Sequence, residues 1–222
     1  MFWKKWMSLY REIENEFGFP YEKELKARDY LSKLLGDRFL KEEAIGKIIG
    51  KEVYVVGFSP ELEKEIELIP KDAVIIAADE AAVVLYENDV NPHIILTDLD
   101  GEIDSLIKIR NAVFGVHAHG DNIHLLPYVD FFAKKFGTTQ IEPLWNVYNF
   151  GGFTDGDRCV FLAHHFGAKI HLIGFNFKEP RIKGEKDFEM KKKKLKWAEY
   201  LISYLKAEGA EIIWENLNSE YS

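Results

Sequence analysis

Residues 94–101 read IILTDLDG: four apolar or β-branched residues lead into Asp98 and Asp100, and Gly101 follows. The apolar part predicts a buried strand. In an extended chain, residues two apart point to the same side of the strand. Two carboxylates that face one point repel each other, so the spacing predicts either a cation between them or a protonated carboxyl group.

Apolar runs of the same kind recur along the chain, at 53–58, 73–79, 112–119, 169–175 and 211–216. Continuous apolar runs of this length are typical of parallel strands that are buried on both faces. The amphipathic stretches between the runs predict helices at 60–68, 79–87, 101–109, 121–136, 156–167 and 187–207. This alternation predicts an α/β domain at 49–222 with a doubly wound, mostly parallel sheet. Residues 1–48 have apolar residues at helical spacing and predict an N-terminal helical segment.

The composition of the 222 residues argues against several classes of protein. A formal net charge of -8 argues against a general nucleic-acid binder, and no apolar run has the length of a membrane span. Cys159 is the only cysteine, which excludes an intrachain disulfide and a thiolate metal cluster. We therefore expect a cytoplasmic protein whose partners are small molecules; homo-oligomer formation is left open. The abundance of Lys and Glu, with Gln140 as the only glutamine, favours a heat-adapted source.

Polar residues and glycines follow nearly every predicted strand. In an open parallel sheet, ligands bind beyond the carboxyl ends of the strands, so these residues are expected to converge at one edge. In chain order they are Gly57, Ser59, Asp79, Asp98, Asp100, His117, His119, Asp121, Asn122, Gly174 and Asn176. The segment 151–158, GGFTDGDR, opens a predicted helix and adds Thr154, Asp155, Asp157 and Arg158. The sequence thus predicts a single ligand site.

Each of these residues also has a structural interpretation. Asp79, Asp155 and Asp157 stand where helices begin and could cap them. His117 and His119 could be hydrogen-bonded side chains at a strand end. The charged stretch 178–194 predicts a loop and then the exposed start of a helix, with a solvated surface.

The combination favours a metal and phosphate site over these separate interpretations. Carboxylates without thiolates suit Mg²⁺, which prefers oxygen ligands, and glycines with helix N-termini suit phosphate. Mg²⁺ with a nucleoside triphosphate supplies the cation that Asp98 and Asp100 require. Transfer from such a triphosphate needs mainly positioning and charge neutralisation.

Four motifs in this order carry a family resemblance. They are AADEAAVVL at 77–85, PHIILTDLDG at 92–101, HAHGDN at 117–122 and GFTDGDR at 152–158. Together they resemble the archaeal-type 6-hydroxymethyl-7,8-dihydropterin pyrophosphokinases, and the resemblance spans about residues 50–178. Thiamine pyrophosphokinases are distantly similar. The resemblance implies a Rossmann-like fold and Mg²⁺-dependent transfer of diphosphate from ATP to a pterin, releasing AMP, in folate or methanopterin synthesis.

Two positions depart from this family, which usually has a glycine where Glu80 stands and more glycine in the loop that includes Gly57 and Ser59. On the resemblance, Asp79, Asp98 and Asp100 are the predicted metal ligands, and Asp98, Asp100, His119 and Asp155 the predicted catalytic residues. The predicted nucleotide- and substrate-binding residues are Gly57, Ser59, Asp79, His117, Asp121, Asn122, Thr154, Asp157, Arg158 and Asn176. The alternatives left open are a thiamine pyrophosphokinase, a hydrolase that uses the HxH pair, and a nucleotide-binding protein without catalysis.

Overall fold

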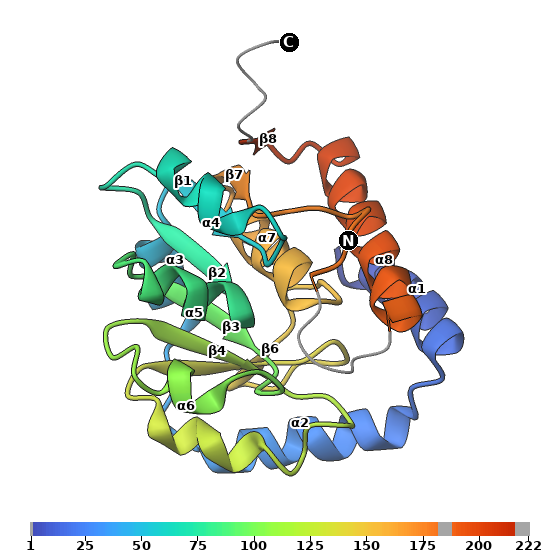
Figure 1. Cartoon of the computed structure of the whole chain (residues 1–222). Coiled ribbons are helices and arrows are strands. Elements are labelled where there is room, and N and C mark those ends of the chain that lie inside the picture. Colours follow the sequence, from blue (N-terminus) through green and yellow to red (C-terminus); the bar gives the residue numbers. More distant parts are fainter. Residues whose placement is uncertain (1, 182–187, 216–222) are drawn as a thin grey trace.

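The computed structural model of the protein describes residues 2–181 and 188–215. Within them the chain forms an eight-stranded sheet with the order β6-β5-β4-β3-β2-β1-β7-β8, and every neighbouring pair is parallel (Figure 1). The strands are β1 (Glu52–Val56), β2 (Ile75–Ala78), β3 (Ile94–Thr97), β4 (Val113–His117), β5 (Lys135–Thr138), β6 (Val147–Tyr148), β7 (Lys169–Ile173) and β8 (Ile212–Trp214). The predicted α/β fold with a parallel sheet is confirmed.

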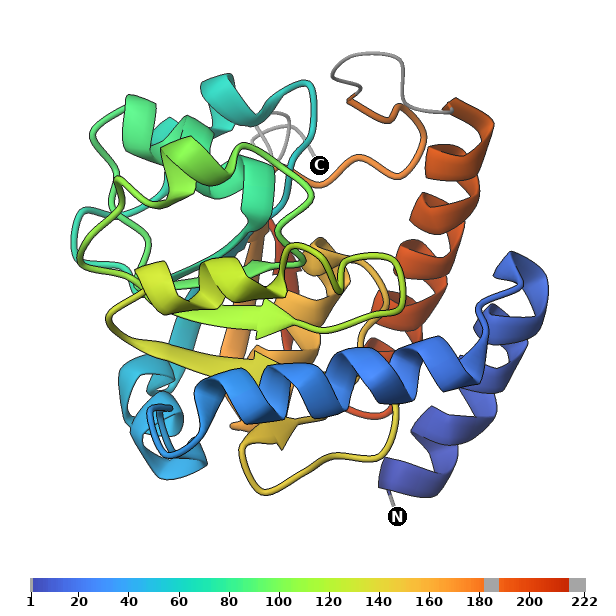
Figure 2. The ribbon, with the colours of Figure 1, turned by 90° about the horizontal axis from the view of Figure 1, so that it is seen from below.

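Helices cover both faces of this sheet (Figures 1 and 2). On one face α5 (Asp79–Glu87) packs against β2 and β3, while α7 (Asp155–His165) packs against β1, β2, β3 and β7. The long helix α8 (Phe188–Ala207) lies along the outer side of α7. Shorter helical segments in the connections are α4 (Leu62–Glu65), η1 (Ile66–Leu68), α6 (Ile103–Leu106) and η2 (Leu126–Phe131).

The strand order reverses direction at β1. From β1 the chain proceeds outward through β2 to β6, and it then returns to the other side of β1 to add β7 and β8. A reversal of this kind leaves a crevice at the carboxyl ends of the two strands involved. Gly57 and Gly174 follow these strands, and a Cβ on Gly174 would lie 2.5 Å from the carbonyl oxygen of Gly57. Gly174 also has a φ of +69°, so only glycine suits this close approach of the two loops.

The predicted N-terminal helical segment consists of α1 (Phe2–Phe17), α2 (Tyr21–Leu35) and α3 (Glu42–Ile49). Helix α1 packs beside α7: the ring of Trp6 lies 5.7 Å from that of Phe161, and its indole N–H donates to the carbonyl oxygen of Gln140 at 2.9 Å. Helix α2 runs across the strands at the β6 edge and contacts β5, β6 and η2 (Figure 2). The buried side chains of all three helices belong to the same hydrophobic core as those of the sheet.

One predicted helix is wrong. Residues 121–136 form η2 and then enter the strand β5, and β6 is a second strand that the apolar pattern missed. The apolar residues Ile123, Leu126, Val129 and Phe132 are spaced by three, which is the period of a 3₁₀ helix and not of an α-helix. Strand β6 has two residues and therefore leaves almost no periodic signal.

The helix predicted at 79–87 has the bounds of α5, and the helix predicted at 60–68 is divided into α4 and η1. The other predicted elements are present with bounds that differ by a few residues; for example, the helix predicted at 101–109 is reduced to α6. Asp187 and Asn216, which end the predicted helix 187–207 and strand 211–216, lie outside the described residues.

Glu24 connects the N-terminal helices to the loop after β4. Its side chain is 1% exposed, and its two carboxylate oxygens accept the backbone N–H of Gly120 at 2.9 Å and the Nε2–H of Gln140 at 3.1 Å. A Cβ on Gly120 would lie 2.6 Å from the Cβ of Lys23, so helix and loop are in direct contact. The N-terminal segment therefore supports the loop that carries His119.

We predict that Glu24→Ala lowers the free energy of unfolding by about 2 kcal/mol, because two buried donors lose their acceptor. Urea denaturation measures this change, and amide hydrogen exchange at Gly120 should become faster. Glu22→Ala, on the exposed side of α2, is the matched control and should be near neutral. Equal effects of the two substitutions would contradict the assigned role of Glu24.

Candidate active site

A cavity of about 300 Å³ lies at the carboxyl ends of the strands, beside the point where the strand order reverses. Its walls come from the loops after β1, β2, β3 and β7, from the first turn of α7 and from one face of α8. Among its lining residues are Gly57, Phe58, Asp79, Glu80, Asp98, Asp100, Phe153, Thr154, Asp155, Arg158, Phe175, Asn176, Phe177, Lys191 and Lys194. The cavity lies at the edge of the sheet where the sequence predicts a ligand site.

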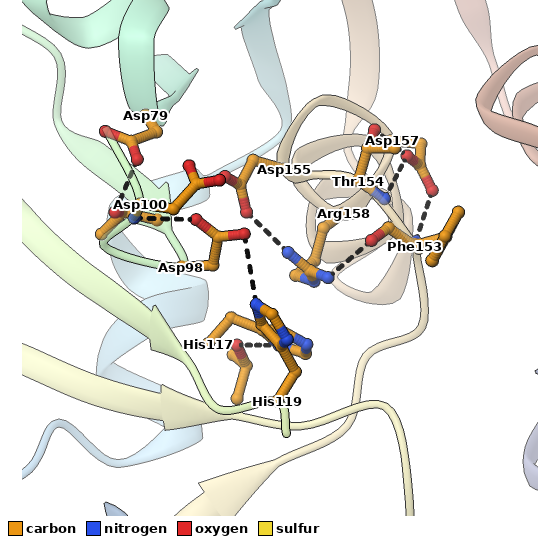
Figure 3. Close-up of polar contacts among 12 residues, drawn as sticks. Asp79, Asp98, Asp100, His117, His119, Phe153, Thr154, Asp155, Asp157 and Arg158 are labelled. Atoms are coloured by element: carbon orange, nitrogen blue, oxygen red, sulfur yellow. Dashed lines mark hydrogen bonds and ion pairs between the residues drawn. The ribbon is translucent and has the colours of Figure 1, made fainter. Parts of the chain in front are cut away.

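Three aspartates from three separate elements meet in this cavity. Asp79 is the first residue of α5, Asp98 follows β3, and Asp155 is the first residue of α7. One carboxylate oxygen from each lies within 4.8 Å of the others, and Figure 3 shows the three side chains pointing toward one another. Asp100 lines the same cavity, but the close group contains Asp155 in its place.

The turn after β3 differs from the extended chain that the spacing suggested. The strand ends at Thr97, and Leu99 has a φ of +68°, so the chain bends between the two aspartates. The hydroxyl oxygen of Thr97 accepts the N–H of Leu99 at 2.8 Å, and a carboxylate oxygen of Asp98 accepts the N–H of Asp100 at 3.1 Å. The expectation that Asp98 and Asp100 share a strand face is thus wrong, although both side chains still line the cavity.

Asp79 is held at the bottom of the cavity, with 4% of its surface exposed. Its Oδ2 accepts the hydroxyl of Thr97 at 3.0 Å, while its Oδ1 is buried and has no hydrogen-bond partner among the described residues. The carboxylate makes no capping bond to α5, so the interpretation as a helix cap is not supported. Burial, followed by the nearby charge of Asp98, raises the pKa of Asp79 to about 8.

The pKa of Asp98 is shifted in the opposite direction to that of Asp79. Burial raises the pKa of Asp98, but His119 and the hydrogen bonds with Asp100 together hold this pKa below its usual range. The Nε2 of His119 lies 3.5 Å from the Oδ2 of Asp98. Two neighbouring carboxyl groups thus have their pKa values pushed apart, so that Asp98 is ionised and Asp79 is protonated near neutral pH. A cation between them would allow both to ionise.

The first turn of α7 organises the third carboxylate. Asp157 accepts the backbone N–H groups of Phe153 and Thr154 at 2.6 and 2.7 Å and completes a capping box with Thr154. Arg158 donates to Asp155 at 2.6 Å and to the carbonyl oxygen of Phe153 at 2.8 Å. Burial, and then the charge of Asp98, raise the pKa of Asp155. Asp157 therefore acts as the cap that the sequence allowed, while Asp155 faces the cavity.

The loop after β4 lies next to the cavity and makes hydrogen bonds to the turn that carries Asp98. Asn122 donates to the backbone oxygens of Asp98 and His117 at 2.6 and 2.7 Å, and it accepts the N–H of His119 at 3.0 Å. His117 is 1% exposed and contacts the hydroxyl of Thr138 at 3.0 Å, and burial holds its pKa well below the usual value. Strand β4 ends at His117, so the two histidines differ in environment, and only His119 reaches Asp98.

Eight of the predicted site residues line the cavity: Gly57, Asp79, Asp98, Asp100, Thr154, Asp155, Arg158 and Asn176. Six others lie around it without lining it: Ser59, His117, His119, Asp121, Asn122 and Asp157. Ser59 is buried, and its hydroxyl oxygen accepts the N–H of Glu61 at 3.2 Å. Asp121 is exposed, and its N–H donates to the ring of His119 at 3.3 Å. The roles of these six residues in ligand binding stay predictions.

The sequence interpretation missed the contribution of α8. A solvated surface holds for Lys192 and Lys193, which are exposed, whereas Lys191 and Lys194 line the cavity. Helical spacing could have predicted this face of α8. A spacing of three and four residues places Lys191, Lys194, Leu195 and Ala198 on one side of the helix. The aromatic lining residues Phe58 and Phe175 also went unassigned.

Comparison with known proteins identifies the family. The family described as 6-hydroxymethylpterin diphosphokinase MptE-like matches residues 29–181. The chain belongs to this family. That match includes all four motifs and the lining segments after β1, β2, β3 and β7, and it begins in α2 of the N-terminal segment.

Three relatives of this MptE-like chain are each named 6-hydroxymethyl-7,8-dihydropterin pyrophosphokinase. The protein from Pyrococcus furiosus is 43% identical over 227 residues, covering 96% of this chain and 98% of the relative. The protein from Methanocaldococcus jannaschii is 36% identical over 91% of this chain and 95% of its own length. The protein from Methanothermobacter thermautotrophicus is 36% identical over 92% and 95%, respectively. Among the described helices, none combines the length and apolar character that crossing a membrane requires.

Asp79 gives a prediction about pH. Because folding raises its pKa, the folded state holds a proton that the unfolded chain releases, and stability falls as pH rises from about 4 toward 8. We expect Asp79→Asn to raise the melting temperature of the protein in EDTA, and the increment should grow from pH 5 to pH 8. Each kcal/mol corresponds to about 2–4 °C in a domain of this size.

The exposed Asp72→Asn is the matched control and should show no such trend. A divalent cation should raise the melting temperature of the wild type more at pH 8 than at pH 6, because binding displaces the proton of Asp79. In Asp79→Asn, the rise in melting temperature on adding the divalent cation should be mostly lost. A pH-independent difference between the variant and the wild type would contradict the assignment.

Proposed function

We propose that this protein transfers a diphosphate group from ATP to the hydroxymethyl group of 6-hydroxymethyl-7,8-dihydropterin and releases AMP. The names of the relatives, which align over nearly their whole length, support the acceptor and the reaction class. The observation that carries the chemistry is the group of three carboxylates from Asp79, Asp98 and Asp155 in the cavity. Such a group suits a metal-bound polyphosphate more than it suits an uncharged ligand.

The carboxylates present fit Mg²⁺. They offer oxygen ligands only, and the buried Oδ1 of Asp79 has no other partner among the described residues. Asp79 and Asp98 would hold the ion, with Asp155 or Asp100 completing the set. The ion, when bound, neutralises charge on the phosphate oxygens. That is the main requirement of phosphoryl transfer.

The remaining lining residues suit the two substrates. Phe153, Phe175 and Phe177 provide apolar surface for a flat heterocycle, and Asn176 offers polar atoms beside them. A ligand slot that combines apolar faces with a few placed polar groups is the common form of such sites. The first turn of α7, with Thr154 and Arg158, presents a helix N-terminus to the cavity, which favours phosphate.

In the reaction, the hydroxymethyl oxygen of the pterin attacks the β-phosphorus of ATP and loses its proton. The bond between the β-phosphorus and the oxygen that bridges it to the α-phosphorus breaks, and AMP leaves with that oxygen. The protein therefore has to hold the acceptor oxygen in line with this bond. His119 would keep Asp98 ionised and in place throughout.

Product analysis tests this proposal. We expect one AMP for each pterin diphosphate when the protein, ATP, Mg²⁺ and the pterin are incubated together and the products are identified by mass. Thiamine should be a poor acceptor, because its cationic ring carries different donors and acceptors. Thiamine diphosphate without a pterin product would refute the acceptor, and ADP with a monophosphorylated acceptor would refute diphosphate transfer.

Asp98→Asn should reduce turnover by roughly 100-fold or more, because a charge that acts on the transferred group is lost. The fold should be retained, since the backbone oxygen of Asp98 still accepts from Asn122. Asp104→Asn, an exposed aspartate on the nearby α6, is the matched control with wild-type turnover expected. Steady-state kinetics and the melting temperature are measured together, and normal turnover of the Asp98 variant would contradict its role.

His119→Ala should lower turnover or Mg²⁺ affinity by about 10-fold, the usual effect of removing a residue that orients a metal ligand. Its melting temperature should change little, because the side chain is 22% exposed. His124→Ala, exposed in the same loop, serves as the control. A large loss of melting temperature with normal specific activity would instead identify His119 as structural.

A further inference from the structure

Helix α8 contributes an entire wall of the cavity, and this wall carries positive charge. The lining residues from α8 are Met190, Lys191, Lys194, Leu195 and Ala198. Their spacing of three and four residues places them on a single helix face, and Ala198 is buried against the rest of the protein. Lys194 is exposed, as Lys192 and Lys193 are, but only Lys191 and Lys194 line the cavity, so the basic run at 191–194 divides into two lining lysines and two that point elsewhere.

The acidic and basic side chains that line the cavity come from different sides of it. Five carboxylates line it, from Asp79, Glu80, Asp98, Asp100 and Asp155, and three cations face them, from Arg158, Lys191 and Lys194. The guanidinium of Arg158 is 4% exposed and already bonds both a carboxylate and a backbone oxygen. Lys191 and Lys194 are the other two lining cations, and each ends a long side chain from α8.

Both lysines are placed to respond to an anion. The Nζ of Lys191 lies 3.8 Å from the Oε2 of Glu80, which is a loose ion pair, and 5.8 Å from the centroid of the Phe58 ring. Lys194 forms no ion pair with any residue of the described parts of the chain. Long side chains with an ammonium group bind phosphate as mobile point charges, without fixed geometry.

We propose that Lys191 and Lys194 bind the triphosphate of the nucleotide from the side opposite the aspartates. This inference rests on the proposed function, and it identifies residues for which neither the motifs nor the family resemblance predicted a role. A triphosphate carries about four negative charges, and one divalent cation balances only half of them. Two ammonium groups on the side away from the aspartates offset part of the remainder. On binding, Lys191 exchanges Glu80 for a phosphate oxygen, and α8 holds the polyphosphate against the metal side of the cavity.

Nucleotide binding tests this assignment without requiring turnover. The probe is an ATP analogue with a methylene group between the α- and β-phosphorus, with Mg²⁺, and its Kd is measured by titration calorimetry. Lys191→Gln and Lys194→Gln should each weaken binding by about 10-fold, as expected for the loss of a charge-assisted contact. Lys191→Arg and Lys194→Arg should stay near the wild-type Kd. The dependence of Kd on salt should be weaker in the two Gln variants.

Lys193→Gln is the matched control, because it removes the same charge from the outward side of the same helix turn. It should bind as the wild type does, and the melting temperatures of all three Gln variants should agree within about 2 °C. The inference is overturned if both inward variants bind normally, if Lys193→Gln weakens binding equally, or if the wild type does not bind the analogue. If the wild type binds it but forms no pterin diphosphate from ATP, the proposed function fails while the lysine assignment stands.

Discussion

The repulsion between three carboxyl groups is the constraint on which this site depends. The oxygens of Asp79, Asp98 and Asp155 lie within 4.8 Å of one another in a largely buried region, where like charges interact strongly. Burial, and then the charge of Asp98, raise the pKa values of Asp79 and Asp155, while His119 and Asp100 hold the pKa of Asp98 low. Raised carboxyl pKa values weaken the folded state near neutral pH. A cation bound between the three groups would relieve this cost, in line with the proposed metal site.

The surrounding structure keeps the three groups together against this repulsion. Thr97 bonds Asp79, and the guanidinium of Arg158 bonds Asp155. A Cβ on Gly101 would lie 2.9 Å from an oxygen of Asp79, so the backbone of the turn packs directly on that carboxylate. Asn122 also donates to the backbone oxygens of Asp98 and His117. Contacts within the protein thus hold the three carboxylates, which suits a site whose contribution is positioning.

The N-terminal helices belong to this support system. Glu24 holds the loop after β4, and Asn122 in that loop holds the backbone of Asp98. Glu24 of α2 is thus connected to Asp98 through the hydrogen bonds that these two residues make with the loop after β4. On the opposite side, α8 closes the cavity with lysines and apolar residues. Helices α2 and α8, which are far apart in the sequence, therefore complete a site whose aspartates lie between them in the chain.

The α/β class, the parallel sheet and the edge at which polar residues gather can all be predicted from the amino-acid sequence. Apolar runs and the direction of parallel strands dictate these features locally, so residues 94–97 and Asp98 could be placed without coordinates. The position of Asp155 beside Asp79 and Asp98 is visible only in the three-dimensional fold, because that contact depends on how α7 crosses the sheet. It also decided which lysines of 191–194 face inward, since helix rotation is set by packing and not by charge. The bend at Leu99 escaped the sequence interpretation, because a left-handed residue leaves no periodic signal.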